Sequence, residues 1–320
     1  MQKQTAPELI TLGETMASLV PVTAGPLRYA QQLYTKIAGA ESNLAIGMAK
    51  LGHHSAWVSR LGKDEIGQLV LNNIRAEGVD MSGVVFDPDH RTGIMIKEMS
   101  AGETSVHYYR ENSAASHLSP DDLNEEFFRG AKIVHLTGIT PVLSDSCRAA
   151  VIRAMDIAEK VGAKISFDPN IRRKLWKGQD LAPFIRELTE RADIVLVGLD
   201  EAEALFGTAA PEEIFDILID NGKATAVAIK NGAEGAWVGN AEHRRHIAPI
   251  DCICVEPIGA GDAFNSGFLS GVLTGVDIET CGRMGNIAGG LATQVSGDYE
   301  GYPSREKMQA MLANAREIYR

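Results

Sequence analysis

The sequence predicts an α/β fold, with a doubly wound, mostly parallel sheet, helices on both faces and a small β lid. Short apolar segments of strand length alternate with longer amphipathic segments of helical period over most of the 320 residues. Such alternation is typical of right-handed crossovers between parallel strands. Two β-like segments without a following helix interrupt the alternation and form the expected lid. One domain covering residues 1–320 accounts for the length.

The expected elements follow in chain order. The sheet begins with a strand at Leu9–Leu12, and helices follow at Ser42–Leu51 and Glu65–Glu77. The middle of the chain continues as strand 133–136, helix 144–161, strand 164–167, helix 182–190, strand 194–197, helix 201–206 and strand 226–229. The last 60 residues contain helical patterns near 262–273, 281–295 and 304–319, and the apolar segment Asp251–Val255 is expected to be the strand that precedes them.

The lid is expected from segments near 14–37 and 92–110, and chiefly from Gln31–Ile37 and Thr92–Tyr109. Within the second segment, Ser100-Ala101-Gly102-Glu103 suits a hairpin turn. Two ordinary edge strands of the main sheet are the alternative interpretation.

Composition and charge exclude several classes of protein. The hydrophobic content of 45% is typical of a globular chain, and a net charge of −11 argues against nucleic acid or an anionic membrane as partner. The four cysteines show no C-x-x-C spacing, the eight histidines show no metal-ligand spacing, and the longest apolar runs are only of strand length. No signal peptide is apparent, so a cytoplasmic protein is expected. P-loop, G-x-G-x-x-G, H-E-x-x-H and G-x-S-x-G motifs do not occur in the sequence.

The most informative motif is Gly259-Ala260-Gly261-Asp262, between an apolar segment and a helical pattern. Glycines at a helix start let an anion approach bare backbone N–H groups. A carboxylate there suits a general base that takes a proton from a hydroxyl as its oxygen attacks phosphorus. This interpretation predicts phosphoryl transfer with Asp262 as base, ionised at neutral pH because of the helix dipole. An ordinary helix N-cap is the alternative.

Polar clusters are predicted to meet at one edge of the sheet, because each follows an expected strand. They are Asp168-Pro169-Asn170-Ile171-Arg172, Lys230–Gly235 and Gly259–Asp262. Lys230–Gly235 offers flexible backbone to nucleotide phosphates, or alternatively a tight hairpin. Arg172 suits a phosphate or carboxylate, or alternatively belongs to a solvated basic patch.

Three motifs resemble those of the ribokinase-like carbohydrate kinases. They are Gly39-Ala40-Glu41-Ser42-Asn43, the turn Gly62–Gly67 and Gly259-Ala260-Gly261-Asp262, and the similarity covers essentially the whole chain. The resemblance implies a doubly wound α/β domain with a β lid that transfers the γ-phosphoryl group of ATP to a sugar hydroxyl with Mg²⁺.

Within this family, the chain is most similar to the 2-keto-3-deoxygluconate kinases. The resemblance rests on Glu41, Tyr108-Tyr109-Arg110, Asp168–Arg172 leading to Leu175-Trp176, and Gly297-Asp298. It implies that a sugar acid is phosphorylated at its terminal hydroxyl, giving the 6-phosphate of 2-keto-3-deoxygluconate. Two arginines in one pocket, Arg110 and Arg172, would be excessive for a neutral sugar, but they suit a carboxylate and a phosphoryl group. A fructokinase, another sugar kinase of this fold, or a non-catalytic sugar-sensing protein are the alternatives.

The resemblance also implies the roles of individual residues. The residues that would bind the substrate are Gly39, Ala40, Asn43, Met95, Tyr108, Arg110, Arg172, Asp262 and Asp298. The residues that would bind the nucleotide and its phosphates are Asn170, Arg172, Lys230, Gly232, Gly235, Gly259 and Gly261, with Ala260 in the anion hole.

Departures from the family pattern affect two of these roles. Met95 stands where related kinases often carry a tyrosine toward the substrate. Gly198 stands at the start of the family's Asn-x-x-Glu motif, whereas Glu201 keeps the acid that would orient hydrated Mg²⁺. Glu256-Pro257 replaces the common Asp-Thr, which leaves a requirement for a monovalent cation open.

A homo-oligomer formed through the lid is expected, because exposed lid edges need a partner.

Overall fold

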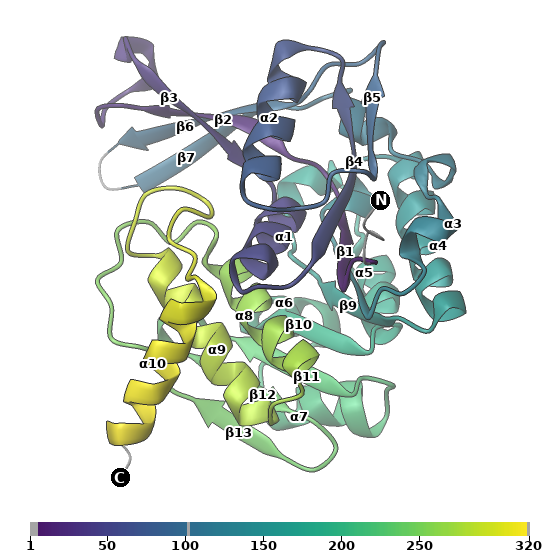
Figure 1. Cartoon of the computed structure of the whole chain (residues 1–320), viewed down its shortest axis with the longest axis vertical. Helices are drawn as coiled ribbons and strands as arrows, with labels where there is room; N and C mark the ends of the chain where they lie inside the picture. The colour runs from purple at the N-terminus through teal and green to yellow at the C-terminus, as the bar shows by residue number, and fades with distance from the viewer. Residues whose placement is uncertain (1–5, 101–102, 319–320) are drawn as a thin grey trace, which may run out of the picture.

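The computed structural model describes residues 6–100 and 103–318. Its largest element is a nine-stranded sheet, called the main sheet here (Figure 1). Its strand order is β13-β12-β11-β10-β9-β8-β1-β4-β5. All neighbours from β5 to β11 are parallel, and β12 and β13 extend the sheet in antiparallel pairing. The bounds are β1 Leu9–Leu12, β4 Ser55–Gly62, β5 Val84–Asp87, β8 Ile133–Thr137, β9 Lys164–Asp168, β10 Ile194–Gly198, β11 Ala226–Lys230, β12 Ala236–Gly239 and β13 Arg244–Ile247.

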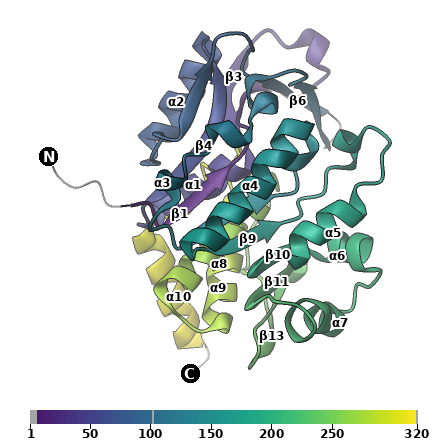
Figure 2. The ribbon, with the colours of Figure 1, turned by 90° about the vertical axis from the view of Figure 1, so that its right-hand side faces the viewer.

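Helices cover both faces of this sheet (Figure 2). Successive strand residues point to opposite faces, so Leu9 packs with α1 and α8 whereas Ile10 packs with α4. Both faces of the central strands are therefore apolar, as the parallel topology requires. The helices are α1 Ala40–Lys50, α2 Glu65–Ala76, α3 Glu125–Phe128, α4 Asp145–Val161, α5 Ala182–Glu190, α6 Leu199–Phe206, α7 Pro211–Phe215, α8 Ala260–Thr274, α9 Ile278–Ala292 and α10 Arg305–Ile318.

Helices α8 and α9 pack with very little space between their backbones. A β-carbon at Gly267 would overlap the backbone carbonyl oxygen of Met284, and one at Gly271 would lie 2.8 Å from the sulfur of Cys281. Glycine at these positions allows the close approach. The packing of α8 against α9 therefore fixes the position of α8, whose first turn lies at the site described below.

A smaller sheet, called the lid sheet here, lies beyond one end of the main sheet (Figure 1). Its order is β3-β2-β6-β7, with β2 and β6 parallel and the other two pairs antiparallel. The strands are β2 Met16–Pro21, β3 Leu33–Ala38, β6 Ile94–Ser100 and β7 Glu103–Tyr109. A mostly parallel main sheet and a small separate lid sheet confirm the predicted fold class.

One predicted strand is wrong and one predicted turn remains untested. Asp251–Val255 forms no strand but crosses the surface, with Ile253 83% and Val255 63% exposed. The segment lies between Pro249 and Pro257, which cannot donate backbone hydrogen bonds. The backbone amides of Val255 and Glu256 donate to the Thr293 carbonyl of a helix end rather than to a neighbouring strand. The predicted turn residues Ala101 and Gly102 lie outside the described residues.

Within residues 6–100 and 103–318, no helix combines the length and the apolar character needed to span a bilayer.

Candidate active site

The turn Gly259–Gly261, called the glycine turn here, begins helix α8. Gly259 caps the helix with φ of +80°, and a β-carbon there would overlap the carbonyl oxygen of Asp298. Tyr302 fixes the turn from the other side, since its hydroxyl donates to the Gly259 carbonyl at 2.8 Å. A β-carbon at Gly261 would meet no atom within 4 Å. The backbone at Gly261 is therefore open to a ligand on its β-carbon side, and the first amides of a helix are the groups that bind an anion.

Asp262 lies in the first turn of α8, as expected, and is partly buried. Its Oδ2 accepts a hydrogen bond from Asn43 Nδ2 at 2.9 Å, so the first turns of α1 and α8 meet here. Burial raises the pKa of Asp262 to about 7, although Asn43 acts in the opposite direction. The helix dipole was expected to favour the ionised acid at neutral pH, whereas burial, the largest cause of the shift, favours the protonated form. A carboxyl group that titrates near neutrality is well suited to general-base chemistry.

The carboxyl ends of β9 and β11 bring a buried charged cluster close to Asp262. Asp168 Oδ2 accepts from Lys230 Nζ at 2.7 Å and from Asn265 Nδ2 at 2.6 Å. Burial alone would lower the pKa of Lys230, but the attraction of Asp168 and Glu201 raises it. Lys230 therefore stays protonated and compensates the carboxylates around it.

Both carboxylate oxygens of Glu201 accept hydrogen bonds from backbone amides. Oε1 accepts from the Ile171 amide at 2.6 Å and Oε2 from the Gly198 amide at 2.8 Å. Burial, and then repulsion from Asp168, raise the pKa of Glu201. Within the part of the chain that the structure describes, no group of three or more His, Cys, Asp or Glu residues could hold a metal ion directly.

The loop after β9 carries Asn170 and Arg172. Asn170 has a φ of +38°, and its amide donates to Asp168 Oδ1 at 3.1 Å. The guanidinium of Arg172 is exposed and lies close enough to lower the pKa of Asp262, against the effect of burial. Among the ion pairs of the described residues, none involves Arg172. The loop therefore presents one cation beside Asp262.

The residues predicted for the substrate side come from the lid sheet, from the segment that follows β7 and from the start of α1. Met95 of β6 is 5% exposed and pairs with Tyr108 of β7, which is 48% exposed. Arg110 forms an ion pair with Glu14, and its guanidinium lies 5.7 Å from the Tyr108 ring centroid. Gly39 caps α1 before Ala40, and a β-carbon at Gly39 would overlap the Glu14 backbone.

Four polar residues that the sequence reasoning did not assign to the site are buried at or near it. They are Glu41, Lys97, Asn265 and Glu256. Burial raises the pKa of Glu41, which accepts hydrogen bonds from Thr137 at 2.6 Å and Thr140 at 2.7 Å. Lys97 lies 2.9 Å from Asp298, so that carboxylate is already paired inside the protein. The position of Lys97 directly after the apolar run Ile94–Ile96 was the available sequence signal, and it does not identify the partners of the lysine.

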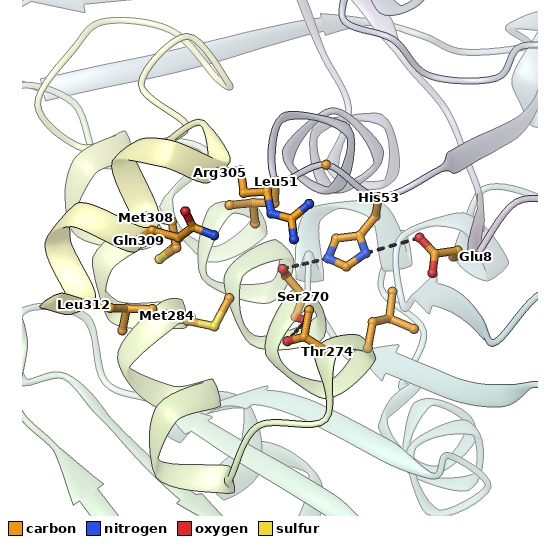
Figure 3. A pocket seen from close by; sticks show the side chains of 12 residues that line it. Glu8, Leu51, His53, Ser270, Thr274, Met284, Arg305, Met308, Gln309 and Leu312 are labelled. Atoms are coloured by element: carbon orange, nitrogen blue, oxygen red, sulfur yellow. Dashed lines mark hydrogen bonds and ion pairs between the residues drawn. The ribbon is translucent and has the colours of Figure 1, made fainter.

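Two cavities lie on different sides of the molecule. One of about 390 Å³ is next to the cluster and is lined by Leu199, Asp200, Glu203, Ala209, Lys230, Asn231 and Gly232. The other, of about 300 Å³, lies between the C-terminal ends of α1 and α8 and helix α10 (Figure 3). In it, His53 Nε2 lies 2.8 Å from Ser270 Oγ. Lys230 and Gly232, which were predicted for the nucleotide side, both line the first cavity. Gly235 closes the hairpin between β11 and β12, so the hairpin interpretation of this segment also holds.

Comparisons with known proteins agree with this geometry. Residues 6–305 match the model of the pfkB family of carbohydrate kinases. The chain is 37% identical over 317 residues to 2-dehydro-3-deoxygluconokinase of Bacillus subtilis (strain 168), covering 98% of this chain and 97% of that protein. A PfkB protein from Polaromonas sp. JS666 is similar in structure, with a TM-score of 0.88, 36% identity and coverage of 95% and 100%.

A second solved structure is informative for its bound groups. A fructokinase double mutant from Vibrio cholerae O395, in a form with bound fructose, ADP and potassium ion, has a TM-score of 0.85 and 26% identity, covering 97% of this chain and 100% of that one.

The burial of Asp262 predicts a pH-dependent cost in stability that Asp262→Asn removes. Its pKa rises from 3.8 in the unfolded chain to about 7 in the fold, so unfolding releases a proton between these values. Stability contributed by this group therefore falls as pH rises through that window. The Tm of the variant minus the Tm of the parent, both measured by calorimetry, should therefore be larger at pH 8 than at pH 5.

The control is Asp277→Asn at the exposed N-cap of α9, where the Thr280 amide holds the carboxyl pKa below its ordinary value. This variant should show no such gain. An equal difference in Tm between Asp262→Asn and the parent at both pH values would contradict the assignment.

Proposed function

The chain belongs to the pfkB family of carbohydrate kinases, which are ATP-dependent phosphotransferases, and we propose that its substrate is a sugar acid phosphorylated at the terminal hydroxyl. The preferred substrate in this proposal is 2-keto-3-deoxygluconate, giving the 6-phosphate. The observation that carries the proposal is the junction of Asp262, Asn43 and the glycine turn, since it combines a base, a hydroxyl-binding amide and an anion hole. The similarity to the Bacillus subtilis enzyme supports the choice of sugar acid.

Asp262 and Asn43 act on the acceptor hydroxyl in this proposal. Asn43 Nδ2 is used by Asp262, whereas its Oδ1 is buried without a hydrogen-bond partner and is free to accept from a sugar hydroxyl. Asp262 takes the proton of the terminal hydroxyl as that oxygen attacks the γ-phosphorus. The amides of Ala260 and Gly261 hold the charge on the transferring group, and the ADP leaving group retains the bonding electrons.

Of the two arginines expected on the substrate side, Arg172 supports an acidic sugar. The charge of Arg110 is balanced by Glu14, whereas Arg172 is exposed and lies near Asp262. Arg172 is therefore the cation available to a carboxylate or to the transferring phosphoryl group. Tyr108 adds an aromatic wall with a polar end.

The nucleotide occupies the cavity next to Lys230 in this proposal. Gly232 lines this cavity and lets phosphates or ribose approach the backbone, since a β-carbon there would meet nothing within 4 Å. In this proposal, Gly235 and Asn170 also lie on the nucleotide side. Asp168 and Glu201 suit Mg²⁺ held through water, since their mutual repulsion, seen in the raised pKa of Glu201, favours a nearby cation. A Mg²⁺ ion held there would supply positive charge against the charge that develops on the transferring phosphoryl group.

Fructokinase activity is the alternative, because a fructokinase shares this fold at 26% identity. A sugar-sensing protein without catalysis is less well supported, since binding alone does not need a carboxyl group that titrates near pH 7 at the anion hole.

Association through the lid sheet is also part of the proposal. Large apolar side chains are exposed there, with Tyr29 at 74%, Tyr34 at 57% and Tyr109 at 64%. A four-stranded sheet with such a surface favours a second copy of the chain as its cover.

The substrate proposal predicts that 2-keto-3-deoxygluconate gives the highest kcat/KM with Mg-ATP. The measurement is a coupled ADP-release assay on this acid, gluconate, fructose and ribose. A clear preference for fructose or ribose would establish the alternative, and absence of turnover on all four would contradict the proposal.

The assignment of Asp262 as base predicts that Asp262→Asn lowers kcat by about 10²–10⁴-fold, with the lower half of this range expected if the proton leaves late. Asparagine caps a helix as well as aspartate, so an N-cap role alone predicts near-normal kcat. The parent's kcat/KM should fall as pH drops below about 7, where Asp262 becomes protonated, and this step should be missing from the residual activity of the variant.

The lid proposal predicts a homo-oligomer at micromolar concentration, measured by light scattering. Tyr34→Ser combined with Tyr109→Ser should shift the mass toward the monomer because it removes exposed aromatic surface. The matched control is Ile152→Ser, because Ile152 of α4 is also exposed, at 37%, but lies outside the lid sheet. This variant should leave the mass unchanged. A parent that is monomeric at that concentration would rule the proposal out.

A further inference from the structure

Lys97 is a fully buried lysine that belongs to the lid sheet but reaches into the loops beside the glycine turn. Its residue exposure is 0%, although it lies in the middle of β6. Its ammonium group is 2.7 Å from Glu256 Oε1 and 2.9 Å from Asp298 Oδ1. Lys97 therefore joins the lid sheet ionically to two C-terminal loops, at a buried point.

Both carboxylates hold segments that define the glycine turn. Glu256 lies three residues before Gly259, and its other oxygen accepts from Ser296 Oγ at 2.9 Å and from the Gly297 amide at 3.1 Å. The carbonyl oxygen of Asp298 occupies the space that a β-carbon at Gly259 would need. The two acids thus bind the loop that enters the turn to the loop that lies against it.

A positive charge at this place has an electrostatic consequence for an anionic ligand. Two buried carboxylates beside an anion hole would repel a phosphoryl group and each other unless a cation lay between them. Burial alone would lower the pKa of Lys97, but Asp298 and Glu256 outweigh burial and raise it, so the side chain stays protonated. The cation is permanent and is attached to the chain itself.

We propose that Lys97 is a positioning residue whose ammonium group acts as a built-in monovalent cation, holding Glu256 and Asp298 in place beside the glycine turn. This inference rests on the proposed phosphoryl transfer. It makes the activity of this chain independent of added potassium, unlike a site that must recruit a cation from solution. Because Lys97 lies on β6, the same contact ties the position of the lid sheet to the shape of the anion hole.

The test compares Lys97→Met with the parent in chlorides of potassium, ammonium, sodium and tetramethylammonium at equal ionic strength. The parent should show the same kcat/KM in all four salts. The variant should lose about tenfold or more in tetramethylammonium, as expected for a loss of electrostatic preorganisation, and recover part of the loss in potassium or ammonium. Tetramethylammonium is too large for the space left by the ammonium group, so it serves as the inert salt.

Lys36→Met is the matched control variant. Lys36 also joins the lid sheet to the same loop, at 2.7 Å from the Ser296 carbonyl and 3.0 Å from Glu300, but it is partly exposed and does not contact Glu256 or Asp298. This variant should keep the parent's kcat/KM and show no dependence on the cation.

A readout without sugar separates this inference from the proposed function. The Tm of Lys97→Met, and its affinity for Mg-ATP, should rise in potassium or ammonium relative to tetramethylammonium, whereas those of the parent should not. A parent without kinase activity would overturn the proposed function, and the cation response of Tm would still test Lys97.

Two results would overturn the role of Lys97. One is strong activation of the parent by potassium, and the other is a variant whose losses are the same in every salt. Where Lys97→Met does not fold, the double variant Lys97→Met and Glu256→Gln removes one charge of each sign, and the same cation-specific recovery is expected of it.

Discussion

The compensation of buried carboxylates is the interaction on which the rest of this site depends. Asp168, Asp262, Glu256 and Asp298 lie around a helix start that must attract an anion, in a chain with a net charge of −11. Two internal lysines, Lys230 and Lys97, balance this charge from opposite sides. Removing one member of a buried pair typically costs about 3–5 kcal/mol, so neither lysine is free to change alone. The anion hole is usable because its acids are neutralised within the protein.

The fold brings these groups together through two different routes. The cluster at Asp168 and Lys230 comes from neighbouring regions of the parallel sheet, where strand ends meet at one edge. The cluster at Glu256 and Asp298 comes from irregular loops that the lid sheet fastens through Lys97. The glycine turn lies between the two, held by a rigid sheet on one side and by the lid sheet on the other. Its geometry therefore depends on both parts of the chain.

The sequence predicted the first route well and the second hardly at all. Strand and helix periodicity gave the main sheet, and the Asp-x-Asn and Lys-Asn-Gly segments were correctly placed at strand ends. The loop Asp251–Val255 looked like a strand because local apolar character does not reveal whether a neighbouring strand exists to pair with it. Lys97 could not be predicted because its partners are 159 and 201 residues away in sequence. The direction of the Asp262 pKa shift was missed for a related reason, since burial is a tertiary property.

The glycine contacts between α8 and α9 give the site a mechanical character. Gly267 and Gly271 press α8 onto its neighbour so closely that the helix has no room to roll or slide independently. The helix then transmits displacement along its axis as a stiff rod, from its buried middle to the amides at its tip. Sensitivity to substitution along this element should follow the contact surface of the rod rather than distance from the reacting atoms. A side chain added well away from Asp262 can misalign the anion hole while leaving every group that touches substrate chemically intact.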